Sequence, residues 1–179
     1  KAFGMNLVAH DKFADPNAPH YAGLDVSFIE LDDKTIISRN EDIENERRVA
    51  IFDLLENNYF APKSSISGDY LGPYNILIRM EDNRLAIDLY TETNNMLSTV
   101  VVPLSPLRAI IKEYFLICDN YYTAIKKAST RRIEAIDLGR RSLHDEGAEI
   151  LRSRIMDKID IDFNTARRLF TLICIMQIR

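Results

Sequence analysis

Apolar and polar residues alternate in four segments of the first half of the chain. The first segment is Leu24–Leu31, and the others lie at about residues 74–80, 85–89 and 96–102. Alternation with a period of two is typical of a β-strand that buries one face. Short turns rich in Asn and Asp separate the last three segments, which favours an antiparallel meander.

Polar positions define the second face of this meander and the connections around it. Arg79 and Asp88 fall opposite the apolar residues, so we expect solvent on that side of the sheet. The segment from Pro62 to Gly68 is rich in serine and predicts a polar, mobile loop. Residues 1–23 contain two prolines and no sustained period, so they are predicted to form an irregular N-terminal arm.

Apolar residues at spacings of three and four predict four helices, at about residues 41–57, 106–127, 130–155 and 163–178. The stretch Tyr114–Cys118 is apolar or aromatic throughout, so we expect its helix to be central and covered on most sides. The residues placed to cap the four helices are Asn40, Ser105, Ser129 and Asp162.

Two glycines, Gly139 and Gly147, interrupt the third of these helices. Each costs about 1 kcal/mol relative to alanine in a helix interior. Such glycines make sense where another backbone approaches closely or where a helix bends.

These elements predict the α+β class of fold. We expect an antiparallel β-meander with an added N-terminal strand, packed against a layer of about four helices in which 106–127 and 163–178 dominate. Residues 24–179 are predicted to form one domain that follows the arm of residues 1–23.

Charge is divided unevenly along the chain. The net charge is −4, which argues against a general nucleic-acid binder. Residues 1–103 carry 9 Lys and Arg against 17 Asp and Glu, whereas residues 104–179 carry 14 against 10. An asymmetry of this kind can mark a basic docking face, although helices also use Lys and Arg as ordinary solvated surface.

Cys118 and Cys174 are the only cysteines, and both lie in apolar runs. We expect buried free thiols and a reducing compartment, which favours the cytoplasm, with the mitochondrial matrix as the alternative. The apolar run from Leu169 to Ile178 is far shorter than the roughly 20 residues of a membrane span, so no span is predicted.

Several long blocks of this chain are similar to the signature segments of UPF0262, an uncharacterised family of alphaproteobacteria. The blocks are ERRVAIFDLLEN (46–57), Gly72-Pro73-Tyr74, IIKEYFLICDNYYTAI (110–125), IEAIDLGRRSLHDEG (133–147) and DFNTARRLFTLIC (162–174). The resemblance brings no activity, cofactor or site with it. The chain departs from the family pattern at Asp145, where Asn is usual, and at Ile175-Met176-Gln177, where an ending nearer Val-Leu-His is usual.

The helix over 130–155 carries the most suggestive group of polar side chains. Arg141 is four residues from Asp137 and three from His144, so the three can share one helical face. Paired guanidinium groups suit a carboxylate or phosphate, and a neighbouring histidine can act as acid, base or donor. The competing interpretation is an intrahelical Asp–Arg ion pair beside a histidine that bridges to another element.

Metal, cofactor and covalent chemistry find little support in the sequence. The three histidines, His10, His20 and His144, are far apart, and no HxH, HExxH or CxxC spacing occurs. Neither cysteine lies beside a histidine, and there is no GxSxG motif. We therefore predict no metal, no cofactor and no catalytic residues.

Two functional hypotheses remain. The first is a non-enzymatic interaction or regulatory protein that docks an acidic partner, a protein or a structured RNA, through an Arg-rich C-terminal helical face. The second is an enzyme or binder of a small phosphate or carboxylate anion at Arg140, Arg141 and His144. The candidate binding residues are Arg140, Arg141, His144, Glu146, Arg167 and Arg168.

Overall fold

The computed structural model describes residues 24–32 and 41–177. The predicted N-terminal arm and the cap at Asn40 lie outside the described residues. The elements are β1 (Val26–Leu31), α1 (Glu41–Glu56), β2 (Phe60–Pro62), α2 (Ser64–Ser67), β3 (Tyr74–Glu81), β4 (Arg84–Thr91), β5 (Met96–Pro103), a 3-10 turn η2 (Ser105–Leu107), α3 (Arg108–Lys127), α4 (Thr130–Ile155), β6 (Ile159–Ile161) and α5 (Phe163–Met176). The predicted α+β class is confirmed.

The main sheet has four strands in the order β1-β3-β4-β5. Strands β3, β4 and β5 form the predicted antiparallel meander, and β1 adds to it in parallel with β3. Asp82 and Asn83, which join β3 to β4, both have positive φ, as a tight two-residue turn between twisted strands requires. Ile76 and Ile78 of β3 pair with Leu89 and Ile87 of β4, and all four are buried.

A second, two-stranded sheet corrects the prediction of a loop over 62–68. Strand β2 pairs antiparallel with β6, and the short helix α2 follows directly after it. Lys63 N donates to Lys158 O over 2.8 Å and extends this pairing. The serine-rich composition of this segment gave no sign of the pairing. The segment is held by β6 and Lys158, nearly 100 residues away in the chain, and no local pattern can predict such a contact.

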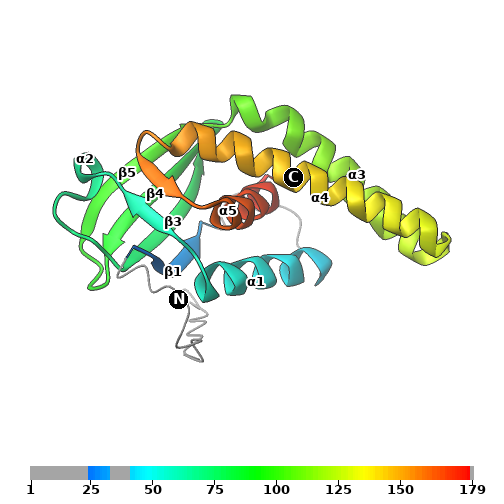
Figure 1. The fold of residues 1–179 in the computed structure, drawn as a ribbon, viewed down its shortest axis with the longest axis horizontal. Coiled ribbons are helices and arrows are strands. Elements are labelled where there is room, and N and C mark those ends of the chain that lie inside the picture. Colours follow the sequence, from blue (N-terminus) through cyan, green and yellow to red (C-terminus); the bar gives the residue numbers. More distant parts are fainter. Residues whose placement is uncertain (1–23, 33–40, 178–179) are drawn as a thin grey trace.

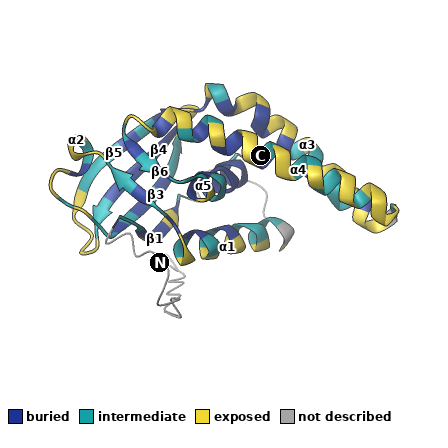
Figure 2. Cartoon of the chain, viewed as in Figure 1, coloured by how far each residue is buried: buried dark blue, intermediate teal, exposed yellow. Residues whose placement is uncertain are grey.

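Helix α5 is the centre of the molecule. Figure 1 shows it between α4 and α1, with the sheet to one side. Every residue from Leu169 to Met176 is buried, and Figure 2 shows much of this helix in dark blue. The prediction that the helix over 106–127 is central was therefore wrong: Leu116 of α3 is 57% exposed. Figure 1 shows α3 and α4 as a long hairpin that extends beyond the rest of the fold.

The two glycines of α4 mark close contacts with side chains, not with another backbone. A Cβ on Gly147 would lie 2.3 Å from the ring of Phe170, which is fully buried in α5. A Cβ on Gly139 would lie 2.7 Å from Cδ1 of Ile117 in α3. The first glycine lets α4 pack directly on the central helix, and the second lets the α3–α4 hairpin close.

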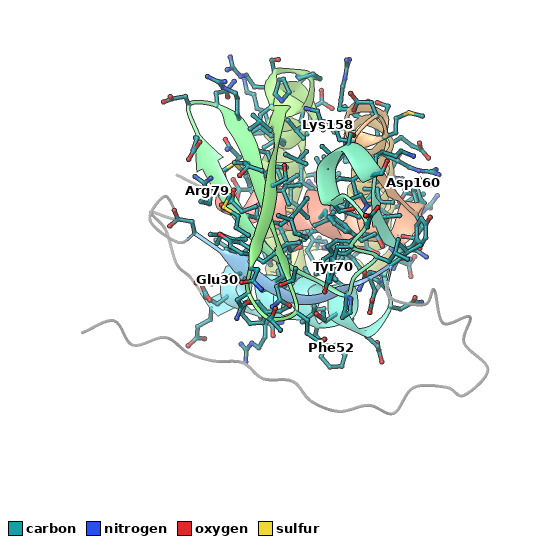
Figure 3. All side chains as sticks on the ribbon, turned by 90° about the vertical axis from the view of Figure 1, so that its left-hand side faces the viewer. Glu30, Phe52, Tyr70, Arg79, Lys158 and Asp160 are labelled. Carbon is teal, nitrogen blue, oxygen red and sulfur yellow. The ribbon has the colours of Figure 1, made fainter. Side chains whose placement is uncertain are left out.

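The second face of the sheet is not exposed to solvent throughout. The prediction that Asp88 faces solvent was therefore wrong, because its side chain is buried. Its carboxylate is only 5% exposed and accepts hydrogen bonds from Arg79 Nε at 2.6 Å and Thr99 Oγ1 at 2.6 Å. The hydrogen bond from Arg79, followed by that from Thr99, holds the pKa of Asp88 below its usual value, against the effect of burial. Figure 3 shows Arg79 at the left of the view, on the opposite side from Asp160.

Among the predicted caps in the described residues, Ser129 and Asp162 lie at N-cap positions, whereas Ser105 does not, because α3 begins at Arg108. Asp162 caps α5, because its Oδ1 accepts from Thr165 N over 2.7 Å. Ser129 occupies the N-cap position of α4 without a side-chain hydrogen bond to the helix. Ser105 lies inside the 3-10 turn that precedes α3, and the N-cap of that turn is Leu104.

Candidate functional site

A groove of about 570 Å³ lies between α1, α4 and α5. It contains five of the six predicted binding residues, whereas Glu146 is exposed elsewhere on α4 and does not line it. We call this the α1–α4–α5 groove. The residues that line it are Asn45, Glu46, Val49, Ala50, Asp53, Tyr122, Arg140, Arg141, His144, Asn164, Arg167, Arg168 and Thr171.

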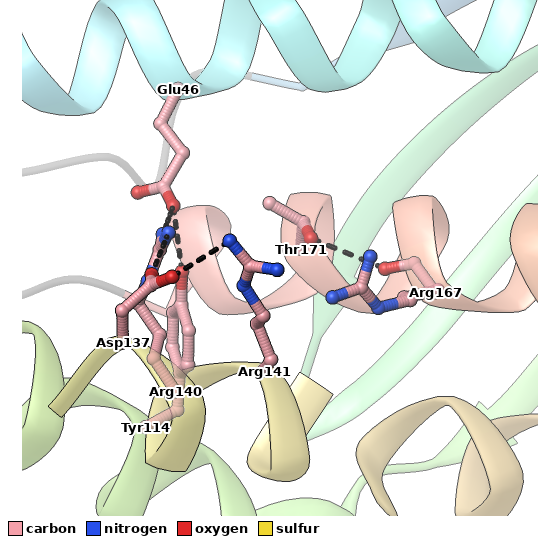
Figure 4. Close-up of polar contacts among 7 residues, drawn as sticks. All are labelled: Glu46, Tyr114, Asp137, Arg140, Arg141, Arg167 and Thr171. Atoms are coloured by element: carbon pink, nitrogen blue, oxygen red, sulfur yellow. Dashed lines mark hydrogen bonds and ion pairs between the residues drawn. The ribbon is translucent and has the colours of Figure 1, made fainter. Parts of the chain in front are cut away.

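Arg140 is occupied within the chain. Its Nη2 lies 2.9 Å from Asp137 Oδ1, and its Nη1 lies 3.5 Å from Glu46 Oε1 of α1. The guanidinium also lies over the ring of Tyr121, 5.1 Å from the centroid. Tyr114 Oη donates to the same Glu46 oxygen over 2.8 Å. Figure 4 shows Glu46 in contact with the side chains of Arg140 and Tyr114. These contacts connect α1 to the α3–α4 hairpin.

Arg141 shares Asp137 with Arg140 but remains open to solvent. Its Nη2 lies 2.8 Å from Asp137 Oδ2, and its side chain is 67% exposed. This is the predicted intrahelical pair at a spacing of four residues. Hydrogen bonding from Arg140, followed by the charges of both arginines, holds the pKa of Asp137 below its usual value. One carboxylate therefore pairs with two guanidinium groups, and the Arg141 side chain stays largely exposed.

Arg167 and Arg168 enter the groove from α5. Arg167 Nε lies 2.8 Å from Asp145 Oδ1 of α4, yet this buried nitrogen has no hydrogen bond within the described part of the chain. The short distance makes Arg167 and Asp145 an ion pair. The missing hydrogen bond means that the Nε–H of Arg167 does not point at the Asp145 carboxylate. Arg168 Nη1 donates to the backbone carbonyl of Asn57, which follows α1.

His144 forms part of the floor of the groove. It is 9% exposed, and its ring lies 4.7 Å from that of Tyr114 and 6.2 Å from that of Phe170, centroid to centroid. Burial, followed by the positive charges of Arg167 and Arg140, lowers the pKa of His144 to about 4. The imidazole is therefore neutral near pH 7. Its Nε2 is buried and, among the described residues, has no hydrogen-bond partner.

The lining holds four arginines, two acidic residues and one histidine, and it contains no Cys, Ser or Lys. Cys118 lies outside it, and burial is the largest of the effects that raise the pKa of its thiol to about 11. Burial likewise raises the pKa of Cys174. Both are poor nucleophiles at neutral pH, since the thiolate is the reactive form. Within residues 24–32 and 41–177 there is no group of His, Cys, Asp and Glu that could hold a metal ion, and no helix with the length and apolarity for crossing a membrane.

Comparison with known proteins identifies the family of this chain. The model of the Uncharacterised protein family (UPF0262) matches residues 25–179. The chain belongs to UPF0262. It is 52% identical over 151 residues to the UPF0262 protein of Paramagnetospirillum magneticum, covering 84% of this chain and 94% of that protein. It is 51% identical over 158 residues to that of Novosphingobium aromaticivorans, covering 86% and 96%. No solved structure matches.

The similarity to UPF0262 confirms the resemblance that the sequence blocks suggested, including the alphaproteobacterial source of most relatives. The bacterial relatives give no support to the mitochondrial alternative. The two departures from the family blocks both have contacts. Asp145 is the partner of Arg167, and Gln177 Nε2 lies 3.5 Å from Met80 Sδ of β3.

Sequence reasoning missed the wall of the groove that α1 provides. Glu46 lies 94 residues from Arg140, and no helical spacing relates them. No sequence pattern points to Asn45, Val49 or Asp53, which lie on the wall that this helix contributes. The one available signal was the UPF0262-like block over 46–57, which includes Val49 and Asp53 but marks family membership and no role.

Proposed function

We propose that this protein is a non-enzymatic binding module that docks an acidic segment of a partner protein in the α1–α4–α5 groove, in the bacterial cytoplasm. The observation that carries the proposal is the gathering of four arginines and a buried histidine in one open groove. Arg141, Arg167 and Arg168 are the expected contacts, because Arg140 is held by Asp137 and Glu46.

The composition of the wall favours a polypeptide over a nucleic acid. Glu46 and Asp53 line the groove beside the arginines and would repel a continuous phosphodiester chain. An acidic peptide can place its carboxylates on the arginines and neutral residues elsewhere. Val49, which is 50% exposed in the wall, offers such a neutral residue an apolar contact.

The length of the groove along α4 and α5 favours a peptide segment over a single small anion as the ligand. The groove-lining positions of α4 span from Arg140 to His144, about 6 Å of helix, and those of α5 from Asn164 to Thr171, about 10 Å. One carboxylate contacts one or two guanidinium groups, whereas an extended acidic segment can reach all of them.

Selection from a random peptide library tests the proposed function. We expect the wild-type protein to enrich peptides with clustered Asp and Glu, bound more weakly as salt rises. The variant Arg141→Glu/Arg167→Glu should lose this enrichment, because the contacts become repulsive. The variant Arg141→Gln/Arg167→Gln removes the two charges without reversing them. It replaces the first variant if charge reversal prevents folding.

Arg131→Glu/Arg132→Glu is the matched control, since both residues are exposed on the same helix and neither lines the groove. Loss of binding in the control as well as in the groove variant would contradict a specific site. Enrichment of peptides without acidic residues, or binding of single-stranded or structured RNA that the groove variants abolish, would overturn the docking of an acidic protein segment.

A further inference from the structure

Two buried nitrogens of the groove lack hydrogen bonds within the described residues: His144 Nε2 and Arg167 Nε. The first is on α4 and the second on α5, and Arg167 contributes the largest charge effect on the His144 imidazole. A buried polar nitrogen without a partner costs roughly 1–3 kcal/mol. With the N–H of the neutral imidazole on Nε2, a ligand oxygen that accepts from His144 recovers that cost. Both nitrogens belong to residues that line the same groove, one from α4 and one from α5.

The guanidinium groups of Arg141 and Arg167 contribute two positive charges to this groove. Both residues line the groove, and Figure 4 shows Arg141 on α4 and Arg167 on α5. Arg141 lies against Asp137, and Arg167 lies against Asp145, which is 53% exposed. Because Arg141 and Asp145 are more than half exposed, both can turn towards or away from a ligand without disturbing the core.

These internal carboxylates decide which anion can bind tightly. A ligand carboxylate must compete with Asp137 and Asp145 for the same guanidinium groups on equal chemical terms. The internal partners have the advantage of a high effective concentration. A phosphate monoester near pH 7 carries almost twice the charge and offers three acceptor oxygens, so it can displace or bridge them.

We propose that the docked segment is anchored by a phosphorylated side chain, whose phosphate contacts Arg141 and Arg167 and accepts a hydrogen bond from His144 Nε2. This inference rests on the proposed function and names the group that the groove recognises. The acidic residues of the segment then add weaker contacts to Arg168 along the groove.

Titration of the full chain with inorganic phosphate and with acetate, at equal ionic strength and pH 7.5, tests the anchor. The readout is the NMR signal of the His144 imidazole, assigned with His144→Gln, and that of the Arg167 Nε–H group. We expect phosphate to shift both signals at about tenfold lower concentration than acetate. His144→Gln and Arg167→Gln should weaken the binding of phosphate, and Arg131→Gln should leave it unchanged.

The same experiment continues with the peptides recovered by the library selection. Replacing one Glu by phosphoserine should lower the Kd by about tenfold in the wild type and much less in Arg167→Gln. If glutamate and phosphoserine peptides bind equally, the phosphate anchor is wrong and acidic docking stands. If phosphate shifts His144 but no peptide binds, the anion subsite stands as a small-ligand site and docking is overturned. If neither phosphate nor peptide binds, both proposals fail.

Discussion

His144 shows how a single side chain is defined by contacts that its own helix does not contain. Its neighbours in α4 supply Asp137, Arg140 and Asp145, whereas Tyr114 of α3 and Phe170 of α5 enclose its ring. The sequence correctly placed His144 on the same helical face as Arg140 and Arg141. It offered no sign of burial, because the aromatic partners come from other helices. Helical spacing therefore predicts which residues are neighbours, but not their solvation.

The lowered pKa of His144 predicts that acid destabilises the fold. A histidine with an ordinary pKa of 6.5 in the unfolded chain and about 4 in the folded protein takes up its proton more readily when unfolded. Its contribution to stability is present above pH 6.5 and is lost as the pH falls through 4. The full difference corresponds to about 3 kcal/mol in the free energy of unfolding. Urea unfolding of the wild type and His144→Gln between pH 4 and 7 measures this effect.

The variant provides the control for that experiment, because every other titratable group is retained. The pH dependence of the free energy of unfolding should be shallower in His144→Gln than in the wild type over this range. Equal slopes in the two proteins would show that His144 keeps an ordinary pKa and is not buried as described.

Packing of α4 on α5 is the contact on which the groove depends at the level of the elements. Gly147 allows it, because the ring of Phe170 occupies the space where a side chain would lie. We predict that Gly147→Ala lowers the free energy of unfolding by about 1–3 kcal/mol, as overpacking of a core usually does. Thermal and urea unfolding measure the loss.

Gly139→Ala is the matched substitution on the same helix. Its Cβ would meet only the end of the Ile117 side chain, which can move, and alanine is favoured in helices by about 1 kcal/mol. We expect a change within about 1 kcal/mol of the wild type. A Gly147→Ala variant as stable as Gly139→Ala would contradict the close approach of α4 to Phe170.

The exposed outer face of α3 shows the limit of reading elements from sequence. Both helices are rich in apolar residues, so periodicity predicted both, and the structure confirms both. Which helix is enclosed depends on the layers around it, and α5 is covered by α1, α4 and the sheet. The apolar residues of α3 that face outward, such as Leu116 at 57% exposure, therefore looked like core.

Folding brings part of the negative charge of the first half of the chain against the positive charge of the second half. Glu46, from the acidic first half, pairs with Arg140 from the basic second half. Asp53 faces the same groove. The sequence showed the asymmetry, yet a tally of charges cannot show which of them neutralise one another. Arg141 remains more available than Arg140 or Arg167, because its side chain is 67% exposed against 27% and 35%.

NMR of the arginine Nε–H groups during titration with an acidic peptide from the selection measures docking in the groove directly. We predict that the signals of Arg141 and Arg167 shift together and saturate with one Kd, while those of Arg131 and Arg132 stay unchanged. Shifts spread evenly over all arginines, or confined to Arg131 and Arg132, would contradict docking in the α1–α4–α5 groove.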